Sequence, residues 1–267
     1  MTPAAINRDP DGPLRPIFIV GCQRSGRTLV RVMLDSHPNI SCGPKTRFLV
    51  KVVDAVIGKQ LPKYLDRFGF PESYWWDRVA EMFDRVHSDY AERRGKQRWA
   101  DKTGTYALHI DVLDKLFPHC QVVHVVRDGR DVVASHRQRF GYVAAVKAAR
   151  KWPVYVRTAR KAGERLGAGR YYEVRYEDLV TDTETTMRKL LDFLGEPWDD
   201  AVLDHGSKPH DMSAMHYSYT AARRAQSGEE SAIYRSRLGA GQRELDPFLR
   251  LACRLMENST QRELGYR

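Results

Sequence analysis

A glycine-rich stretch near the start of the chain carries residue types that bind phosphate. Residues 21–28 read GCQRSGRT, which matches the phosphate-loop pattern GxxxxGK[ST] except that Arg27 replaces the lysine. The glycines let the backbone curve closely around an anion, and the first amides of a following helix point at it. Arg24, Ser25 and Thr28 add side-chain donors. The alternative is a tight turn with surface arginines, but a turn needs neither the two arginines nor the two hydroxyls.

A second residue that could bind an anion follows a later apolar run. Residues 121–126 (QVVHVV) predict a buried strand, and Arg127 comes directly after it. Ligands of open α/β sheets bind at the carboxyl ends of the strands, where a planar guanidinium suits a phosphate dianion. A nucleotide-hydrolysing enzyme usually holds magnesium with an acid at such a strand end. Here Arg127 is the residue at the strand end, and Asp128 comes one residue later, which favours a second phosphate site over a metal site. The alternative is that Arg127 forms an ion pair with Asp131.

Three strand-and-helix units are expected to position these residues. Residues 15–21 (RPIFIVG) predict a strand before the glycine loop, and residues 170–175 (RYYEVR) predict another. The latter precedes an amphipathic helix over residues 184–194, whose buried face comprises Met187, Leu190, Leu191 and Leu194. Strands that alternate with helices predict an α/β fold with a parallel sheet covered on both faces.

The domain organisation follows from what interrupts these units. Residues 50–98 read as a helical cap inserted between the first two units. The sequence shows no repeat and no long Gly/Ser linker. We therefore expect a flexible N-terminus over residues 1–14 and a single domain over residues 15–267.

Composition limits the class of protein. The 267 residues carry 44 Lys plus Arg against 34 Asp plus Glu, a net charge of +10, and 42% are hydrophobic, which excludes wholesale disorder. The longest stretch without a charged residue is eleven residues, Leu116–Val126 and Met212–Ala222, so no membrane span is expected. The four cysteines lack metal-ligand spacing and are expected to be buried free thiols. Without a visible signal sequence, a cytoplasmic location is the simplest expectation.

The excess of positive charge predicts an anionic partner. Nucleic acid, an acidic membrane surface and a phosphate-rich small molecule are the candidates. A nucleic-acid-binding protein would carry a long basic stripe with interleaved aromatic residues. The arginines singled out above instead lie at strand ends, which favours the small molecule.

Two segments together resemble a known family. IFIVGCQRSGRTLVRVMLDSHPNISCG is similar to the 5′-phosphosulfate-binding segment of sulfotransferases that use 3′-phosphoadenosine 5′-phosphosulfate (PAPS). VVHVVRDGRDVVAS is similar to their 3′-phosphate-binding segment. The similarity is greatest to bacterial members related to tyrosylprotein sulfotransferase and covers residues 15–50 and 98–198. It implies a three-layer P-loop-type fold and PAPS as the cofactor, with 3′,5′-ADP as its product and no metal.

The resemblance also implies roles for individual residues. Those matched to the 5′-phosphosulfate are Arg24, Ser25, Gly26 and Thr28, whereas Arg27 stands where the family usually has Thr or Ser. Those matched to the 3′-phosphate are Arg127 and Ser135, with Arg235 and Arg237 as candidates from a later basic loop. Tyr176 matches a position near the nucleotide, and Lys102 matches a lysine that reaches the transferring sulfuryl group.

One position departs from the family pattern. Relatives have a glutamate general base in a CGxET-like segment, and Lys45 occupies its place here in CGPKTR. Three hypotheses follow. Arg24, Arg47 and Lys102 lower the pKa of Lys45 so that it serves as the base; or Lys45 contacts an anionic acceptor that needs little help; or another residue is the base, the candidates being His109, His136, Asp101 and His37.

The predicted function is therefore sulfuryl transfer from PAPS to a hydroxyl or amine of a small-molecule, lipid or peptide acceptor, which is anionic under one hypothesis. Two alternatives stay open. One is a sulfotransferase-fold protein whose catalysis is altered by Lys45. The other is a P-loop kinase that uses Mg-ATP, with Asp128 or Asp101 on the metal. A homodimer is compatible with each of them.

Overall fold

A five-stranded parallel sheet forms the centre of the protein. The computed structural model describes residues 15–57, 65–206 and 237–266. The strands lie in the order β2-β3-β1-β4-β5. Their bounds are β1 Ile17–Val20, β2 Ile40–Cys42, β3 Arg98–Asp101, β4 Gln121–Val126 and β5 Tyr171–Arg175.

The sequence predicted three of these strands. β1, β4 and β5 are confirmed, as are the parallel sheet and its flanking helices. β2 and β3 were missed because they span three and four residues and include Ser41, Arg98 and Asp101. These polar side chains are buried in the sheet, and so short a run shows no apolar pattern.

The register of β1 brings several strand ends together. Ile17 pairs in parallel with Ala100 of β3 on one side and with Gln121 of β4 on the other. After β1 the chain turns toward β2 and β3, and it later returns to β4 and β5. Ligands of open α/β sheets bind outside the carboxyl ends of the strands at such a switch point.

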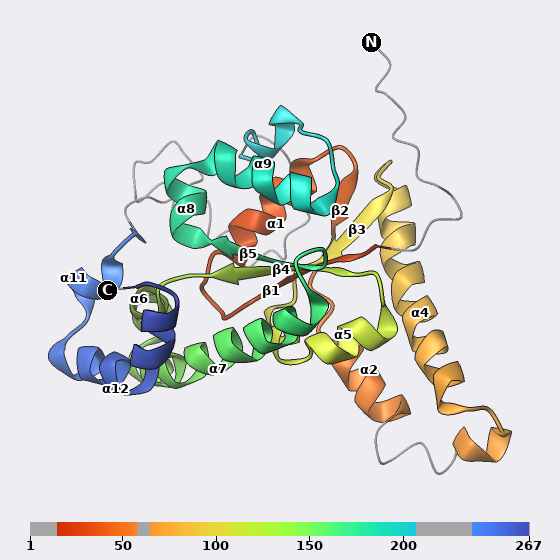
Figure 1. The fold of residues 1–267 in the computed structure, drawn as a ribbon, viewed down its shortest axis with the longest axis horizontal. Coiled ribbons are helices and arrows are strands. Elements are labelled where there is room, and N and C mark those ends of the chain that lie inside the picture. The colour runs from red at the N-terminus through yellow and green to blue at the C-terminus, as the bar shows by residue number, and fades with distance from the viewer. Residues whose placement is uncertain (1–14, 58–64, 207–236, 267) are drawn as a thin grey trace.

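Helices cover both faces of the sheet (Figure 1). Phe18 and Val20 of β1 face one apolar cluster, and Ile17 and Ile19 face the other. The first cluster is built with α2 (Leu49–Val56), α4 (Glu72–Glu92), η2 (Gly104–Leu108), α5 (Ile110–Leu116) and α7 (Tyr142–Leu166). The second is built with α1 (Arg27–Ser36), α8 (Tyr176–Thr181), α9 (Thr183–Leu194) and η3 (Asp200–Val202).

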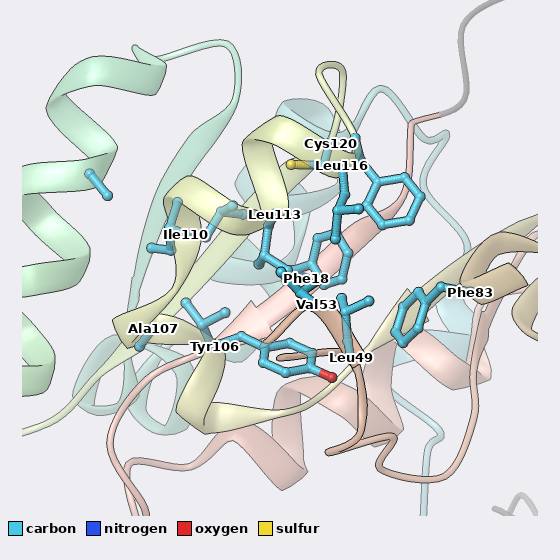
Figure 2. Packing of buried hydrophobic residues seen from close by; sticks show 14 of the residues in the cluster. Phe18, Leu49, Val53, Phe83, Tyr106, Ala107, Ile110, Leu113, Leu116 and Cys120 are labelled. Carbon is cyan, nitrogen blue, oxygen red and sulfur yellow. The ribbon is translucent and has the colours of Figure 1, made fainter. Parts of the chain in front are cut away.

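Aromatic rings fill much of the first cluster (Figure 2). The ring of Phe18 lies 5.6 Å from that of Trp99 and 6.2 Å from that of Tyr106, measured between ring centroids, with both pairs edge to face. Tyr106 therefore anchors η2 to the sheet directly after Lys102. The hydroxyl of Tyr106 lies 3.2 Å from that of Thr46, on the segment after β2.

Two regions complete the fold. The predicted helical insertion contains α2, the 3-10 helix η1 (Asp66–Phe68) and α4 among its described residues. The sequence did not identify α7, which runs for 25 residues with Pro153 inside it. Two further helices, α11 (Ala240–Glu244) and α12 (Pro247–Glu263), pack against α7 and α6 (Gly129–Phe140).

Two expectations from composition, on the cysteines and on membrane spans, can be compared with the structure. All four cysteines are buried and free, as predicted. Within the described ranges, no helix is long and apolar enough to cross a membrane. The predicted helix over residues 184–194 is confirmed as α9, and its four apolar residues are buried.

A substitution on α9 tests how much this packing contributes. Leu190 is fully buried, so Leu190→Ala is expected to lower the free energy of unfolding by about 2–5 kcal/mol, because it leaves a cavity. Leu255→Ala on α12 is the matched control: its side chain is 74% exposed, and the expected change is within about 0.5 kcal/mol. Urea denaturation measures both, and equal losses would contradict this packing.

Candidate anion-binding site

The glycine loop between β1 and α1 has the backbone of an anion cradle. Gly21 and Gly26 have φ angles of 134° and 100°. A side chain on Gly21 would collide with the carbonyl of Val125, and one on Gly26 would collide with the ring of Tyr176. Arg24, at φ 74°, is the one described non-glycine residue with a positive φ. Such backbone strain clusters at ligand-binding sites.

The same loop opens α1 without a side-chain cap. Gly26 is the N-cap residue and makes no side-chain hydrogen bond to the first amides of the helix. These amides and the positive end of the helix dipole therefore suit an anion. Ser25 is 1% exposed, and its hydroxyl has no hydrogen-bond partner in the described structure. Thr28 lies in the first turn of α1 and is partly exposed.

The two predicted anion-binding segments contact each other. The Nε of Arg24 donates to the hydroxyl of Ser135 on α6, with 2.9 Å between the two atoms. In return, an Nη of Arg127 donates to the backbone carbonyl of Arg24 at 3.3 Å. Residues more than 100 positions apart in the sequence thus form one site.

Arg127 is buried but retains one unused donor. It is 5% exposed, its backbone carbonyl accepts from the indole of Trp152, and its Nη2 lies 3.4 Å from a carboxylate oxygen of Asp131. Its Nε has no hydrogen-bond partner among the described residues. A buried donor without a partner is costly, so this atom is well suited to an anionic ligand.

Tyr176 joins the two segments from a third strand end. Its ring lies against Gly26 on one side, and the guanidinium carbon of Arg127 lies 4.3 Å from the ring centroid. Glu177 beside it accepts from the amide of Asp128 and from the hydroxyl of Tyr266, both at 2.9 Å. Burial raises the pKa of Glu177. Glu177 therefore links β4, α8 and the C-terminal segment.

Asp131, the alternative ion-pair partner of Arg127 in the sequence analysis, lies in the first turn of α6. It is 2% exposed and accepts hydrogen bonds from the amides of Gly239 and Gly241 at 3.0 and 2.7 Å. A side chain on Gly241 would collide with the backbone of Arg130, so glycine lets α11 lie close to α6. The carboxylate is buried because it satisfies these amides.

The later basic loop contacts Arg127 through a backbone carbonyl. The carbonyl of Arg237 accepts from Arg127 at 2.7 Å, while the guanidinium of Arg237 forms an ion pair with Glu244. The side chain of Arg237 is therefore engaged away from Arg127 in this structure. Arg235 lies outside the described residues.

Lys102 follows β3 at the same edge of the sheet and is only 2% exposed. Burial is the largest cause that lowers its pKa to about 6, and the charges of Lys45, Arg27 and Arg31 contribute to this value. Arg27 lies over Gly104, where any side chain would overlap its guanidinium, and it donates to the carbonyl of Cys22. Burial likewise lowers the pKa of Arg27, to about 10.

Lys45 lies on a segment that α1 fixes in place. Arg31 donates twice to the carbonyl of Cys42, at 3.1 and 3.0 Å, and Asp35 accepts from the amide of Cys42 at 2.9 Å. Arg94 holds Asp35 with two further hydrogen bonds. The sequence analysis did not identify Arg31 and Asp35. Both are charged residues on the face of α1 that carries the apolar residues, and this position was their only signal in the sequence.

The predicted alternative bases lie in different surroundings. Asp101 is buried, and its Oδ2 accepts from the hydroxyl of Thr46 and lies 3.5 Å from His87. The Nδ1 of His136 contacts the carbonyl of Val132, and burial lowers the pKa of His136. His37 contacts the carbonyl of Pro197 and the amide of Asn39. His109 precedes α5, beyond η2.

The two acids proposed as magnesium ligands differ in how far they are engaged by hydrogen-bond donors. The carboxylate of Asp128 accepts from Arg130 through its amide, Nε and Nη2, and from Gln261 at 3.1 Å. Asp101 accepts from Thr46 through its Oδ2, while its buried Oδ1 has no hydrogen-bond partner among the described residues. The residues at the strand ends therefore fit a polyanion better than a magnesium ion. We define the candidate anion-binding site by Arg24, Ser25, Arg27, Lys102, Arg127 and Ser135.

Comparisons of sequence place the chain among known proteins. A model described as the sulfotransferase family matches residues 16–200. The protein-tyrosine sulfotransferase of Drosophila melanogaster is 32% identical over 203 residues, 71% of this chain and 40% of that protein. Protein-tyrosine sulfotransferase 1 of Danio rerio is 33% identical over 219 residues, 76% of this chain and 58% of that protein. The chain thus spans 40% to 58% of the length of these curated relatives.

Solved structures share the fold. The sulfotransferase domain from the Synechococcus PCC 7002 olefin synthase aligns with a TM-score of 0.66 and 24% identity over 94% of this chain and 96% of that one. The sulfotransferase domain from the curacin biosynthetic pathway aligns at 0.65 and 19% identity over 96% and 99%. A mouse sulfotransferase, SULT7A1, complexed with PAP, aligns at 0.52 and 14% identity over 94% and 85%.

Two observations now agree. The parallel sheet carries a glycine loop, a buried lysine and a buried arginine at adjacent strand ends, and the sequence matches both the family model and protein-tyrosine sulfotransferases at more than 30% identity. The chain belongs to the sulfotransferase family.

Proposed function

We propose that this protein transfers a sulfuryl group from PAPS to a hydroxyl or amine of an acceptor. The observation that supports it most is the contact between the two anion-binding segments through Arg24, Ser135 and Arg127. A nucleotide with a 5′-phosphosulfate and a 3′-phosphate carries negative charge at both ends, which two adjacent cationic sites would bind. The names of the relatives and the PAP complex of the mouse neighbour point to the same ligand.

In this proposal, different residues bind the two ends of the nucleotide. The glycine loop, with Arg24, Ser25 and Thr28, holds the 5′-phosphosulfate against the N-terminus of α1. Arg127 and Ser135 hold the 3′-phosphate. PAPS supplies the sulfuryl group that is transferred. Lys102, when protonated, donates to the oxygen on which charge develops, and Tyr176 keeps the loop and Arg127 at a constant separation.

The kinase alternative finds less support. Mg-ATP would need a free carboxylate at a strand end, and the carboxylate of Asp128, which follows β4, is engaged by Arg130 and Gln261. The alternative of altered catalysis depends on Lys45, which replaces the glutamate of the relatives. The acceptor class (small molecule, lipid or peptide), the homodimer and the cytoplasmic location stay predictions from the sequence.

Calorimetry tests the identity of the nucleotide. We expect 3′,5′-ADP to bind without magnesium and to bind more tightly than Mg-ATP, because ATP lacks the 3′-phosphate that Arg127 and Ser135 would hold. Ser135→Ala should weaken 3′,5′-ADP and leave Mg-ATP nearly unchanged. Tighter binding of Mg-ATP would contradict the proposal, and so would an equal loss for both nucleotides.

Proton uptake tests the role of Lys102. Its pKa is about 6 in the free protein, so the amine is mostly neutral at pH 7.5, and a bound anion raises that pKa. Binding of 3′,5′-ADP should therefore take up protons, and its affinity should fall as the pH rises above 6. The uptake is measured from binding enthalpies in Tris and triethanolamine, since anionic buffers would compete.

Two variants make this measurement specific. Lys102→Arg keeps a cation that stays protonated at all relevant pH values, so the proton uptake should decrease strongly. Lys115→Arg, on the far end of α5 and paired with Glu72, is the matched control and should take up as many protons as the wild type. Undiminished uptake in Lys102→Arg would show that Lys102 is not the titrating group.

A further inference from the structure

A long stretch of the chain carries many cations and no acid. Residues 132–163, which form most of α6 and α7, contain eight lysines and arginines and neither Asp nor Glu. The eight are Arg137, Arg139, Lys147, Arg150, Lys151, Arg157, Arg160 and Lys161. None of them belongs to the candidate anion-binding site. Much of the positive charge of the protein therefore lies where the proposed nucleotide would not neutralise it.

Large apolar side chains are exposed in the same region. Tyr142 and Val143 are exposed at the start of α7, and Phe248, Leu251 and Leu255 are exposed on α12. All of these except Tyr142 are at least half exposed. Single exposed apolar residues are normal, but a contiguous group of them marks an interaction surface.

Contacts between α7 and α12 make these residues contiguous. The rings of Tyr142 and Phe248 lie 6.1 Å apart, measured between centroids. The hydroxyl of Tyr142 donates to Asp246, the N-cap residue of α12, at 3.1 Å. Leu249 and Cys253 are buried in a cluster with alanines of α7. Consequently α12 lies along the start of α7 at the edge of the molecule (Figure 1).

The helical period places cations beside the apolar side chains of α12. Phe248, Leu251 and Leu255 follow one another at intervals of three and four residues, so they share one face of the helix. Arg250 and Arg254 are also exposed, and each comes one residue before a leucine of that face. They form a cationic edge along the apolar face.

The exposed face of α7 repeats this combination. Val143, Lys147 and Arg150 are spaced four and three residues apart, and all three are exposed. We call the following residues the α12 surface: Tyr142, Val143, Phe248, Leu251 and Leu255, with the cations Lys147, Arg150, Arg250 and Arg254.

The two acids just before α12 are engaged by other groups. Asp246 accepts from the amide of Leu249 at 3.0 Å as well as from Tyr142. Glu244 forms an ion pair with Arg237, with 3.0 Å between the charged atoms. These carboxylates therefore have partners of their own, and the α12 surface keeps a positive character.

We propose that the α12 surface binds the surface of an anionic lipid bilayer. Its five apolar side chains enter the boundary between headgroups and acyl chains, and its four cations contact the anionic headgroups. A helix that combines apolar and cationic faces binds bilayers in this way, by apolar burial together with electrostatic attraction. The inference does not rest on the proposed function, because the α12 surface shares no residue with the candidate anion-binding site.

The composition of the α12 surface favours a bilayer over other anionic partners. Single-stranded nucleic acid binds through bases stacked on aromatic rings, and the exposed tips of Val143, Leu251 and Leu255 offer no ring for stacking. A second copy of this chain in a two-fold dimer would bring the same cations against each other, which costs electrostatic energy.

An acidic protein is the remaining alternative. Such a partner would need a surface whose shape matches the side chains that stand on the outer faces of α7 and α12. A bilayer accepts exposed side chains at its interface without a matching pocket. The bilayer is therefore the occupant that the exposed residues fit best, and the experiments below separate the two.

Vesicle flotation tests the inference on the whole chain. We expect the protein to float with phosphatidylcholine vesicles that contain about 30% phosphatidylserine, and much less with phosphatidylcholine alone, since each cation near an anionic surface contributes about fivefold in affinity. Added NaCl should release the protein, because salt screens exposed charges. Failure to float with the anionic vesicles at low ionic strength would overturn the inference.

A pair of apolar variants tests insertion. Leu251→Ser combined with Leu255→Ser should weaken binding to anionic vesicles by about tenfold or more, because two side chains lose their apolar burial. The matched control combines Met82→Ser with Val86→Ser, two exposed residues of α4, which lies on the other side of the molecule (Figure 1). An unchanged affinity in the α12 variant, or an equal loss in the control, would overturn the inference.

A pair of charge variants tests the cationic edge. Arg250→Gln combined with Arg254→Gln should weaken binding to anionic vesicles by about 10- to 30-fold. Arg78→Gln combined with Arg85→Gln removes two exposed arginines from α4 and changes the net charge equally. If the α4 variant lost as much affinity as the α12 variant, net charge alone would govern binding and the α12 surface would not be the site.

A fluorescent label separates a bilayer from an acidic protein. The four native cysteines are buried, so a nitrobenzoxadiazole group can be attached selectively at Leu255→Cys and, as the control, at Met82→Cys. Anionic vesicles should shift the emission of the first label to shorter wavelength and leave the second unchanged. Poly-glutamate should shift neither. Tight binding of poly-glutamate without any shift in vesicles would identify an acidic protein as the partner and overturn the inference.

The outcomes for this inference and for the proposed function are independent. Flotation is measured without nucleotide, and 3′,5′-ADP binding is measured without vesicles. The serine and glutamine variants should all bind 3′,5′-ADP as tightly as the wild type, which shows that they are folded. Loss of flotation with intact nucleotide binding therefore assigns the effect to the α12 surface.

Discussion

The position of β1 between β3 and β4 is the constraint on which the rest of the site depends. Ile17 lies in parallel register with Ala100 and with Gln121, so the three strands end at one edge of the sheet. The glycine loop, Lys102 and Arg127 each come directly after one of these strand ends. Cations repel one another, and here the peptide hydrogen bonds of the sheet hold them together instead of side-chain attraction.

Holding these cations close together costs free energy, as the lowered pKa values of two of them indicate. Burial and neighbouring positive charge lower the pKa of Lys102 to about 6 and that of Arg27 to about 10. The apolar clusters on both faces of the sheet supply the offsetting stability, since they are remote from solvent and continuous with β1. A polyanionic ligand would relieve the repulsion, so binding and electrostatic stabilisation of the protein are coupled.

Much of the fold and part of the site could be predicted because the relevant signals are local. β1, β4 and β5 are apolar runs, α9 has helical spacing, and the glycine loop is contiguous in the chain. β2 and β3 gave no such signal, since short buried strands with polar residues show no period. The burial of Asp131 was also hidden, because the amides that it satisfies come from α11, more than 100 residues later.

By itself, the sequence determined the parallel α/β class, predicted that residues 21–28 and Arg127 bind an anion, and revealed the lysine at position 45. Only the tertiary structure decided what surrounds that lysine. Arg31 and Asp35 of α1 hold its segment, Thr46 takes up the carboxylate of Asp101, and Lys102 arrives from β3. The physical reason is that the pKa of a group depends on the charges and solvent around it, and these come from elements distant in the sequence.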